Sequence, residues 1–122
     1  MQLETVSPSP IIKEWLDHFK INHHTEVPFS DSSTKLQFYI PSIALGILVP
    51  NWKKPISVTV LHQAVHAYEN MNLSEVVIIA DRVSFYVEET MKRLRYPVKI
   101  IDSYSLSELL VLFEKKSKSV LA

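Results

Sequence analysis

An unbroken apolar run, Val76 to Ile79, constrains the fold more than any other feature of the chain. It lies inside the segment Glu75–Ala80 and has the length of a strand rather than a helix. A strand with no polar face is typical of a sheet that is covered on both sides. The run therefore predicts a layered α/β architecture.

The residues after this strand continue the α/β pattern. Apolar residues at helical spacing follow it, namely Val83, Val87, Met91 and Leu94. A short strand, Val98–Ile101, comes next behind Pro97. A strand–helix–strand unit of this length predicts parallel pairing with a right-handed crossover. Ser105 and Glu108 form a capping-box pattern, which predicts that the chain ends in a helix carrying Leu106, Leu109, Leu110 and Phe113.

The N-terminal half begins with a helix signal, Ser9 followed by Pro10, and then repeats apolar residues at helical spacing. Three extended segments are expected next, a strand and then a hairpin pair: Thr25–Phe29, Leu36–Ile40 and Ile43–Val49. Pro41 and Pro50 should lie at strand ends or on an edge, so we expect the hairpin to pack one face only. A second helix is expected over Ser57–Asn70, with Ser57 as its cap.

The predicted order is α-β-β-β-α-β-α-β-α, an α/β three-layer sandwich with a mixed central sheet. With 122 residues the chain suits one domain with one core, and residues 1–8 are expected to be a flexible N-terminus. Five aromatic residues lie on periodic apolar faces and are interpreted as core: Trp15, Phe19, Phe38, Phe85 and Phe113.

Composition excludes several classes of function. The chain has no cysteine, which removes disulfides, thiolate metal sites and cysteine nucleophiles. Gly46 is the only glycine, so a glycine-rich phosphate loop cannot be built. The 13 basic and 13 acidic residues balance, so any binding of nucleic acid must come from a local patch. Neither a targeting signal nor a membrane span is evident, and the cytoplasm is the default location.

Three stretches resemble the Mrr-type branch of the restriction-endonuclease-like, or PD-(D/E)XK, nucleases. The first runs from Gly46 to Ser57 and contains the sequence Asn-Trp-Lys-Lys-Pro. The second is the buried strand at Val76–Ala80 with the helix that follows, and the third is Val98–Asp102 with Leu106–Leu110. The resemblance implies a restriction-endonuclease-like sandwich over more than half of the chain.

The catalytic motif of that family is degenerate here. The resemblance implies a carboxylate on the second strand and a Glu/Gln-x-Lys on the third, which hold Mg²⁺ and activate water. The corresponding positions are Gln37, or its neighbours Lys35 and Leu36, on the second strand, and Leu48 and Pro50 on the third. None of these can ligate the metal or assist the nucleophile as the family motif does. We therefore expect no catalysis and assign no cofactor.

A local basic–aromatic patch is the candidate for contact with nucleic acid, since cations hold phosphates and aromatic rings stack on bases. Its residues are Trp52, Lys53, Lys54, Arg82, Lys92 and Arg93. The alternative is that the cations of the third helix form an ordinary solvated face, offset by Glu88 and Glu89.

Histidines offer weaker candidates for a metal site. His62, His66 and Glu69 share one side of the second helix, and Gln63 lies where the similar zinc-protease helix needs a glutamate general base. A second group, His18, His23 and His24, lies near the end of the first helix. For both groups the simpler interpretation is solvated or locally bonded histidines, and we assign no metal.

The leading hypothesis is a non-catalytic nuclease-like domain that binds DNA or an active nuclease or helicase partner, and that pairs as a homodimer. One alternative is an active Mg²⁺-dependent endodeoxyribonuclease with a migrated site that uses Glu26, Asp31 or Asp81. The other is a protein-interaction module that binds no nucleic acid.

Overall fold

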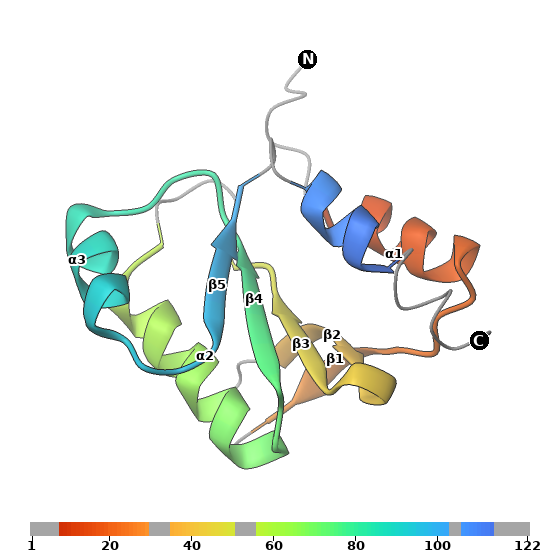
Figure 1. Ribbon diagram of the computed structural model, residues 1–122, viewed down its shortest axis with the longest axis horizontal. Coiled ribbons are helices and arrows are strands. Elements are labelled where there is room, and N and C mark those ends of the chain that lie inside the picture. Colours follow the sequence, from red (N-terminus) through yellow and green to blue (C-terminus); the bar gives the residue numbers. More distant parts are fainter. Residues whose placement is uncertain (1–7, 30–34, 51–55, 103–105, 114–122) are drawn as a thin grey trace.

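The elements follow the predicted order along the chain. The computed structural model describes residues 8–29, 35–50, 56–102 and 106–113. The elements are α1 (Ser9–His18), β1 (His24–Pro28), β2 (Lys35–Ile40), the 3-10 helix η2 (Pro41–Ile43), β3 (Leu45–Leu48), α2 (Val58–Met71), β4 (Glu75–Ile79), α3 (Phe85–Arg93) and β5 (Val98–Ile101). Residues 107–113 form a last helical segment (Figure 1).

One mixed sheet of five strands organises the described residues, in the spatial order β1-β2-β3-β4-β5. The pairs β1–β2 and β2–β3 are antiparallel, whereas β3–β4 and β4–β5 are parallel. The predicted parallel pairing across α3 is therefore confirmed. The α/β fold class is confirmed as well, and its order and mixed sheet are consistent with a restriction-endonuclease-like sandwich.

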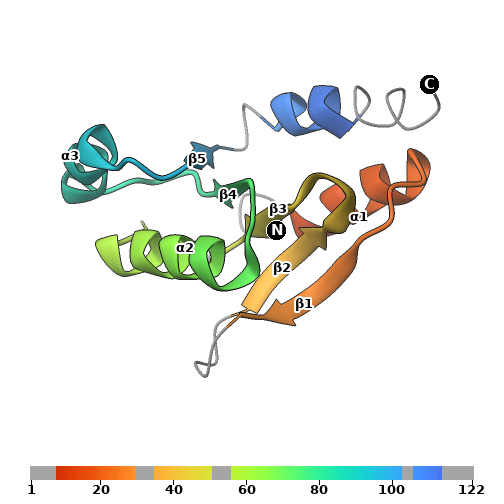
Figure 2. The same cartoon turned by 60° about the horizontal axis from the view of Figure 1, so that its bottom comes forward.

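Helices cover both faces of the sheet (Figure 2). On one face α2 and α3 pack on the strands, and the buried residues there include Leu61, Ala64, Val76, Ile78 and Val87. On the other face α1 and the helical segment 107–113 lie side by side, and the buried residues there include Ile12, Leu16, Ile47, Val77 and Phe113. The sheet thus separates two apolar cores.

Strand β4 shows the predicted burial on both faces. Val76 and Ile78 belong to the core under α2, whereas Val77 and Ile79 belong to the core under α1. The expectation that the β2–β3 hairpin packs one face only is wrong. All four residues of β3 are buried, because helices cover the hairpin from both sides.

One element boundary that differs from the prediction lies at the start of β3. Ile43 was expected in the strand but belongs to η2, which Pro41 begins directly after β2. Ala44 then adopts a left-handed conformation with φ 50° and ends this turn. The short helix therefore reverses the chain between the paired strands β2 and β3.

The N-caps of α2 and α3 differ in their contacts. Ser57 lies at the N-cap of α2, as predicted, but its side chain makes no capping hydrogen bond. Ser84 at the N-cap of α3 does so, because its Oγ accepts a hydrogen bond of 3.3 Å from the Val87 backbone N–H. Ser105 of the predicted capping box lies outside the described residues, and Glu108 pairs with Lys99 instead, at 3.1 Å.

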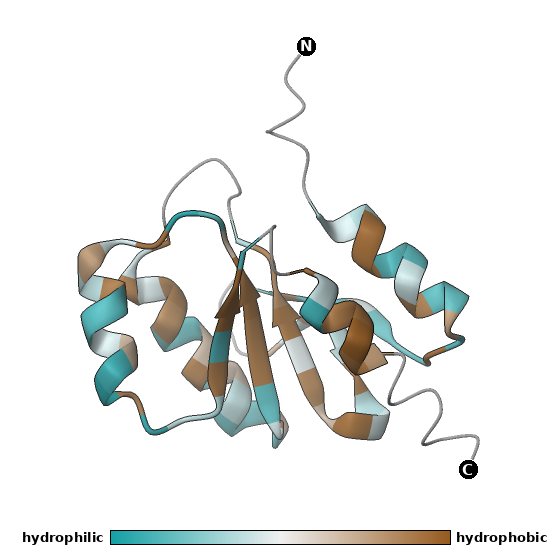
Figure 3. Cartoon of the chain, turned by 45° about the horizontal axis from the view of Figure 1, so that its top comes forward, coloured by the Kyte–Doolittle hydropathy of each residue, from teal (hydrophilic) through white to brown (hydrophobic). Residues whose placement is uncertain are grey.

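The aromatic residues predicted in the core are buried with one exception. Phe38 and Phe113 are buried, and Trp15 and Phe19 are partly buried against the same core. The prediction for Phe85 is wrong, because its side chain is 68% exposed. Phe85 begins α3, whose inward face carries Val87 rather than its neighbours. In Figure 3 the strands are coloured mainly as hydrophobic, whereas much of α3 is coloured as hydrophilic.

None of the helices in the described ranges is long and apolar enough to cross a membrane.

Candidate functional site

The position where the family resemblance implies a metal-binding carboxylate lies at the end of the β2–β3 ladder. The backbone register of the two strands runs from Ile40 opposite Leu45 to Phe38 opposite Ile47. Beyond this pair the side chain of Gln37 continues the contact, and its Oε1 accepts a hydrogen bond from the backbone N–H of Val49. The amide oxygen of Gln37 thus replaces a missing backbone acceptor.

The alternation of β2 breaks at the same place. Leu36 and Phe38 are two residues apart and should face one side of the sheet, yet they belong to opposite cores. On the neighbouring strand β1, Glu26 falls between two paired residues and has a left-handed φ of 50°. Both strands are therefore irregular around Gln37. An irregularity of this kind re-aims side chains, and here it directs Gln37 toward β3.

The other two degenerate positions follow on β3 and supply no chemistry. Leu48 is buried in the core under α2 and pairs with Ile78 of β4. Pro50 comes two residues later and is partly exposed. The described part of this strand end therefore presents an amide that is already bonded, an apolar side chain and a ring without a donor.

Two acidic residues meet at the carboxyl end of the parallel strands. Asp81 follows β4 and Asp102 follows β5. The residues just before them are joined by a backbone hydrogen bond, because the N–H of Ala80 donates to the carbonyl of Ile101 at 3.0 Å. Both aspartates line a groove of about 830 Å³ beside α3, together with Glu88, Lys92 and Lys99. Acidic and basic groups are thus mixed along this groove.

The acids proposed for a migrated nuclease site are not gathered in one place. Glu26 lies on β1 and Asp81 follows β4, which is three strands away in the sheet. Three strand spacings amount to about 14 Å, too far for two carboxylates to share one ion. Asp31 lies outside the described residues. Of the two described acids, Asp81 has a second acid, Asp102, at the end of the adjacent strand.

The predicted contacts with nucleic acid lie around α3 where they are described. Arg82 precedes the helix, whereas Lys92 and Arg93 lie in its last turn. Nine helical residues span about 13 Å, so the cations flank the helix rather than cluster. Lys92 pairs with Glu89 at 2.9 Å. Trp52, Lys53 and Lys54 lie outside the described residues, but Ile56 just after them donates its N–H to the Arg82 carbonyl.

Sequence reasoning missed an exposed aromatic pair at the start of α3. Phe85 is 68% exposed and Tyr86 is 75% exposed, and their ring centroids lie 6.1 Å apart. The spacing gives a mixed signal, because Phe85 is off the stripe of Val83, Val87 and Met91, whereas Tyr86 stands three residues after Val83 and fits it. Helical periodicity alone therefore does not separate this pair from the core residues.

The histidines do not assemble a metal centre within the described ranges. His62, His66 and Glu69 are exposed on α2, and no group of three or more potential ligands there could hold a metal ion. The histidines near α1 make local ring contacts instead. His18 contacts Phe19 edge-on, and His24 stacks with Tyr39.

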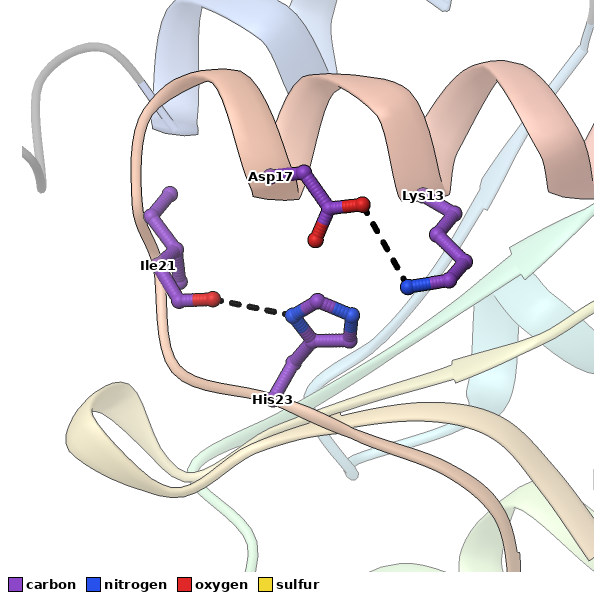
Figure 4. A network of polar contacts seen from close by, with 4 residues as sticks. All are labelled: Lys13, Asp17, Ile21 and His23. Atoms are coloured by element: carbon purple, nitrogen blue, oxygen red, sulfur yellow. Dashed lines mark hydrogen bonds and ion pairs between the residues drawn. The ribbon is translucent and has the colours of Figure 1, made fainter.

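His23 is held by its own loop. Its Nδ1 lies 2.9 Å from the carbonyl oxygen of Ile21, close to the Lys13–Asp17 ion pair of α1 (Figure 4). Because a carbonyl only accepts, Nδ1 carries the proton in this contact. The contact closes the turn between α1 and β1.

Comparisons with known proteins yield no relative for this chain: no family model, no curated protein and no solved structure matches it. The functional argument therefore depends on the residues and their geometry.

Proposed function

We propose that the chain is a non-catalytic nuclease-like domain that acts by binding DNA as an accessory or structural subunit of DNA processing. The observation that carries this proposal is the contact of Gln37. At the position of the expected metal-binding carboxylate, an amide oxygen is committed to the Val49 backbone N–H. Leu48 and Pro50 fill the other two positions of the motif with groups that bind no metal.

The exposed charges around α3 support the part of the proposal that concerns the binding of DNA. Arg82, Lys92, Arg93 and Arg95 are all exposed around α3, opposed by Glu88 and Glu89 within the same stretch. The exposed Phe85 and Tyr86 lie among these cations. Phosphates bind such cations by releasing counterions, which makes the affinity fall steeply with salt.

The test is a binding and cleavage series with the purified protein on labelled duplex, single-stranded and branched DNA, with Mg²⁺ or Mn²⁺. We expect retention that weakens with salt and no cutting. The double variant Arg82→Ala/Arg93→Ala should lower the slope of log affinity against log salt by one to two, at roughly 0.9 per duplex phosphate contact. Lys13→Ala/Lys35→Ala removes the same charge from other elements and should leave binding unchanged.

Two results would overturn the proposal. Metal-dependent cutting would favour the active nuclease, and loss of that cutting in Asp81→Asn or Asp102→Asn would place its site in the groove beside α3. A lack of retention on every DNA form would favour the protein-interaction module. Homodimerisation stays a prediction, and sedimentation of the same sample tests it.

A further inference from the structure

The exposed pair Phe85 and Tyr86 is the least explained feature of the described surface. Large apolar side chains on a protein surface need no explanation singly, but an adjacent pair marks a contact surface. Both residues lie in the first turn of α3, a helix at the outer side of the molecule (Figure 1). They contact each other at an interplanar angle of 71°, and both residues are largely exposed to solvent.

The charges on the same helix face indicate the chemistry of the occupant. Residues seven or eight positions apart share a face of a helix, so Arg93 lies on the face of Phe85 and Tyr86. Glu89 lies on that face as well, but Lys92 pairs with it at 2.9 Å. Arg82 stands three residues before Phe85, and neither arginine has an acidic partner among the described residues. Two exposed rings and two exposed guanidinium groups therefore lie on this helix and just before it.

This combination suits an anionic chain with free aromatic faces. Unpaired bases stack on aromatic side chains, while their phosphates bind arginine. Bases inside a duplex are already stacked on one another and offer no free face to a protein ring. Two rings inclined at 71° also cannot both lie parallel to one rigid base stack, whereas a flexible single strand can turn each base separately.

We propose that Phe85 and Tyr86 stack on unpaired bases of a single-stranded nucleic acid, with Arg82 and Arg93 holding its phosphates. This inference rests on the proposed function and refines it, because it names the strand form and the stacking residues. In this proposal a duplex contacts the cations around α3 but not the two rings.

The test measures fluorescence anisotropy with labelled oligo(dT), oligo(U) and a mixed-sequence duplex, each about 20 units long. In Phe85→Ala/Tyr86→Ala the affinity for single strands should fall at least 10-fold, as expected for lost base stacking. The affinity for the duplex should stay within 2-fold. Comparison of the two oligonucleotides shows whether the strand is DNA or RNA.

Matched variants separate stacking from other effects. The swap Phe85→Tyr/Tyr86→Phe keeps both rings and should bind single strands like the wild type. Ile11→Ala/Val111→Ala removes two other exposed apolar side chains and should have no effect. Glu89→Gln removes the acid on the binding face and should raise the affinity for single strands several-fold. Because Phe85 and Tyr86 are exposed, circular dichroism should show each variant folded.

The outcomes distinguish this inference from the proposed function. An unchanged affinity of Phe85→Ala/Tyr86→Ala for single strands, with the wild type still binding DNA, overturns the stacking inference alone and indicates a protein partner for the rings. An equal loss on single strands and duplex overturns it as well. A wild-type protein that retains no nucleic acid overturns both.

Discussion

At the scale of single residues, Gln37 shows how one side chain can complete a strand pair. Its Oε1 is the acceptor for the part-buried backbone N–H of Val49, twelve residues away. Gln37→Ala should lower the free energy of unfolding by about 1–3 kcal/mol, because the N–H loses its partner. Urea denaturation followed by circular dichroism measures this change.

Gln37→Glu is the control for that prediction, since a carboxylate oxygen can accept the same hydrogen bond. It should cost less stability than Gln37→Ala. Equal stability of the two variants would show that the contact with Val49 contributes little. Because Gln37→Glu also places a carboxylate on the second strand, assaying it for cutting shows whether this acid alone restores activity. We expect none while Leu48 and Pro50 remain.

Gly46, the only glycine of the chain, allows a close approach between β3 and two leucines. A Cβ at this position would lie 2.8 Å from Leu73 Cδ1 and 3.0 Å from Leu36 Cδ1. Both leucines are buried in the core under α2 and have little room to move. Gly46→Ala should therefore destabilise the protein by roughly 1–3 kcal/mol through overpacking.

A double-mutant cycle with Leu73→Ala tests the stated cause, because truncating Leu73 makes room for the new methyl group. The cost of Gly46→Ala should be smaller in the Leu73→Ala background than in the wild type. The same cost in both backgrounds would exclude Leu73 as the source of the clash.

At the scale of elements, the two serine N-caps predict different energetics for two helices. Ser84 Oγ accepts from the Val87 N–H at the start of α3, whereas Ser57 makes no such bond at the start of α2. Ser84→Ala should cost about 1 kcal/mol of unfolding free energy, and Ser57→Ala should cost clearly less. Parallel urea titrations of the two variants measure the difference, and equal costs would contradict the capping assignment.

Most elements could be predicted from the sequence because their periodicity is local. The strands β4 and β5 and the helix α2 lie where the pattern indicates. In α2 the predicted stripe of Val58, Leu61, Val65 and Tyr68 is only partly right, because Leu61 is fully buried together with Ala64 and Ala67, whereas the other three are partly buried. The start of β3, in contrast, could not be predicted from this periodicity. Ile43 has the composition of a strand residue, but the turn from β2 takes it into η2.

At the scale of the whole molecule, the two cores lie on opposite faces of the same central sheet and should unfold together. Leu16 of α1 and Leu61 of α2 are fully buried on opposite faces. Leu16→Ala and Leu61→Ala should each cost about 2–5 kcal/mol. Each variant should still unfold in one transition, with its midpoint at a lower denaturant concentration than in the wild type. Tryptophan fluorescence and circular dichroism should report the same midpoint.

Separate transitions for the two probes in either variant would contradict the expected single cooperative domain. A change of the denaturant slope without a second transition would instead indicate an altered denatured state. The matched pair is informative because the two leucines belong to different helices and have no core in common.

The candidate site was only partly predictable for a related reason. The sequence alone indicated that cations flank α3, and the family resemblance implied that Gln37, Leu48 and Pro50 correspond to the catalytic motif. It did not indicate the contact from Gln37 to Val49 or the exposure of Phe85 and Tyr86. Both depend on how strands and helices meet in space.

The sequence by itself determined the order of the main helices and strands, and that β4 is buried on both faces, because these follow from the spacing of apolar residues along the chain. Only the tertiary structure decided that helices cover both faces of the β2–β3 hairpin and that Phe85 faces solvent. Burial depends on what the fold brings against a side chain. The apolar character of a side chain does not determine which element packs against it.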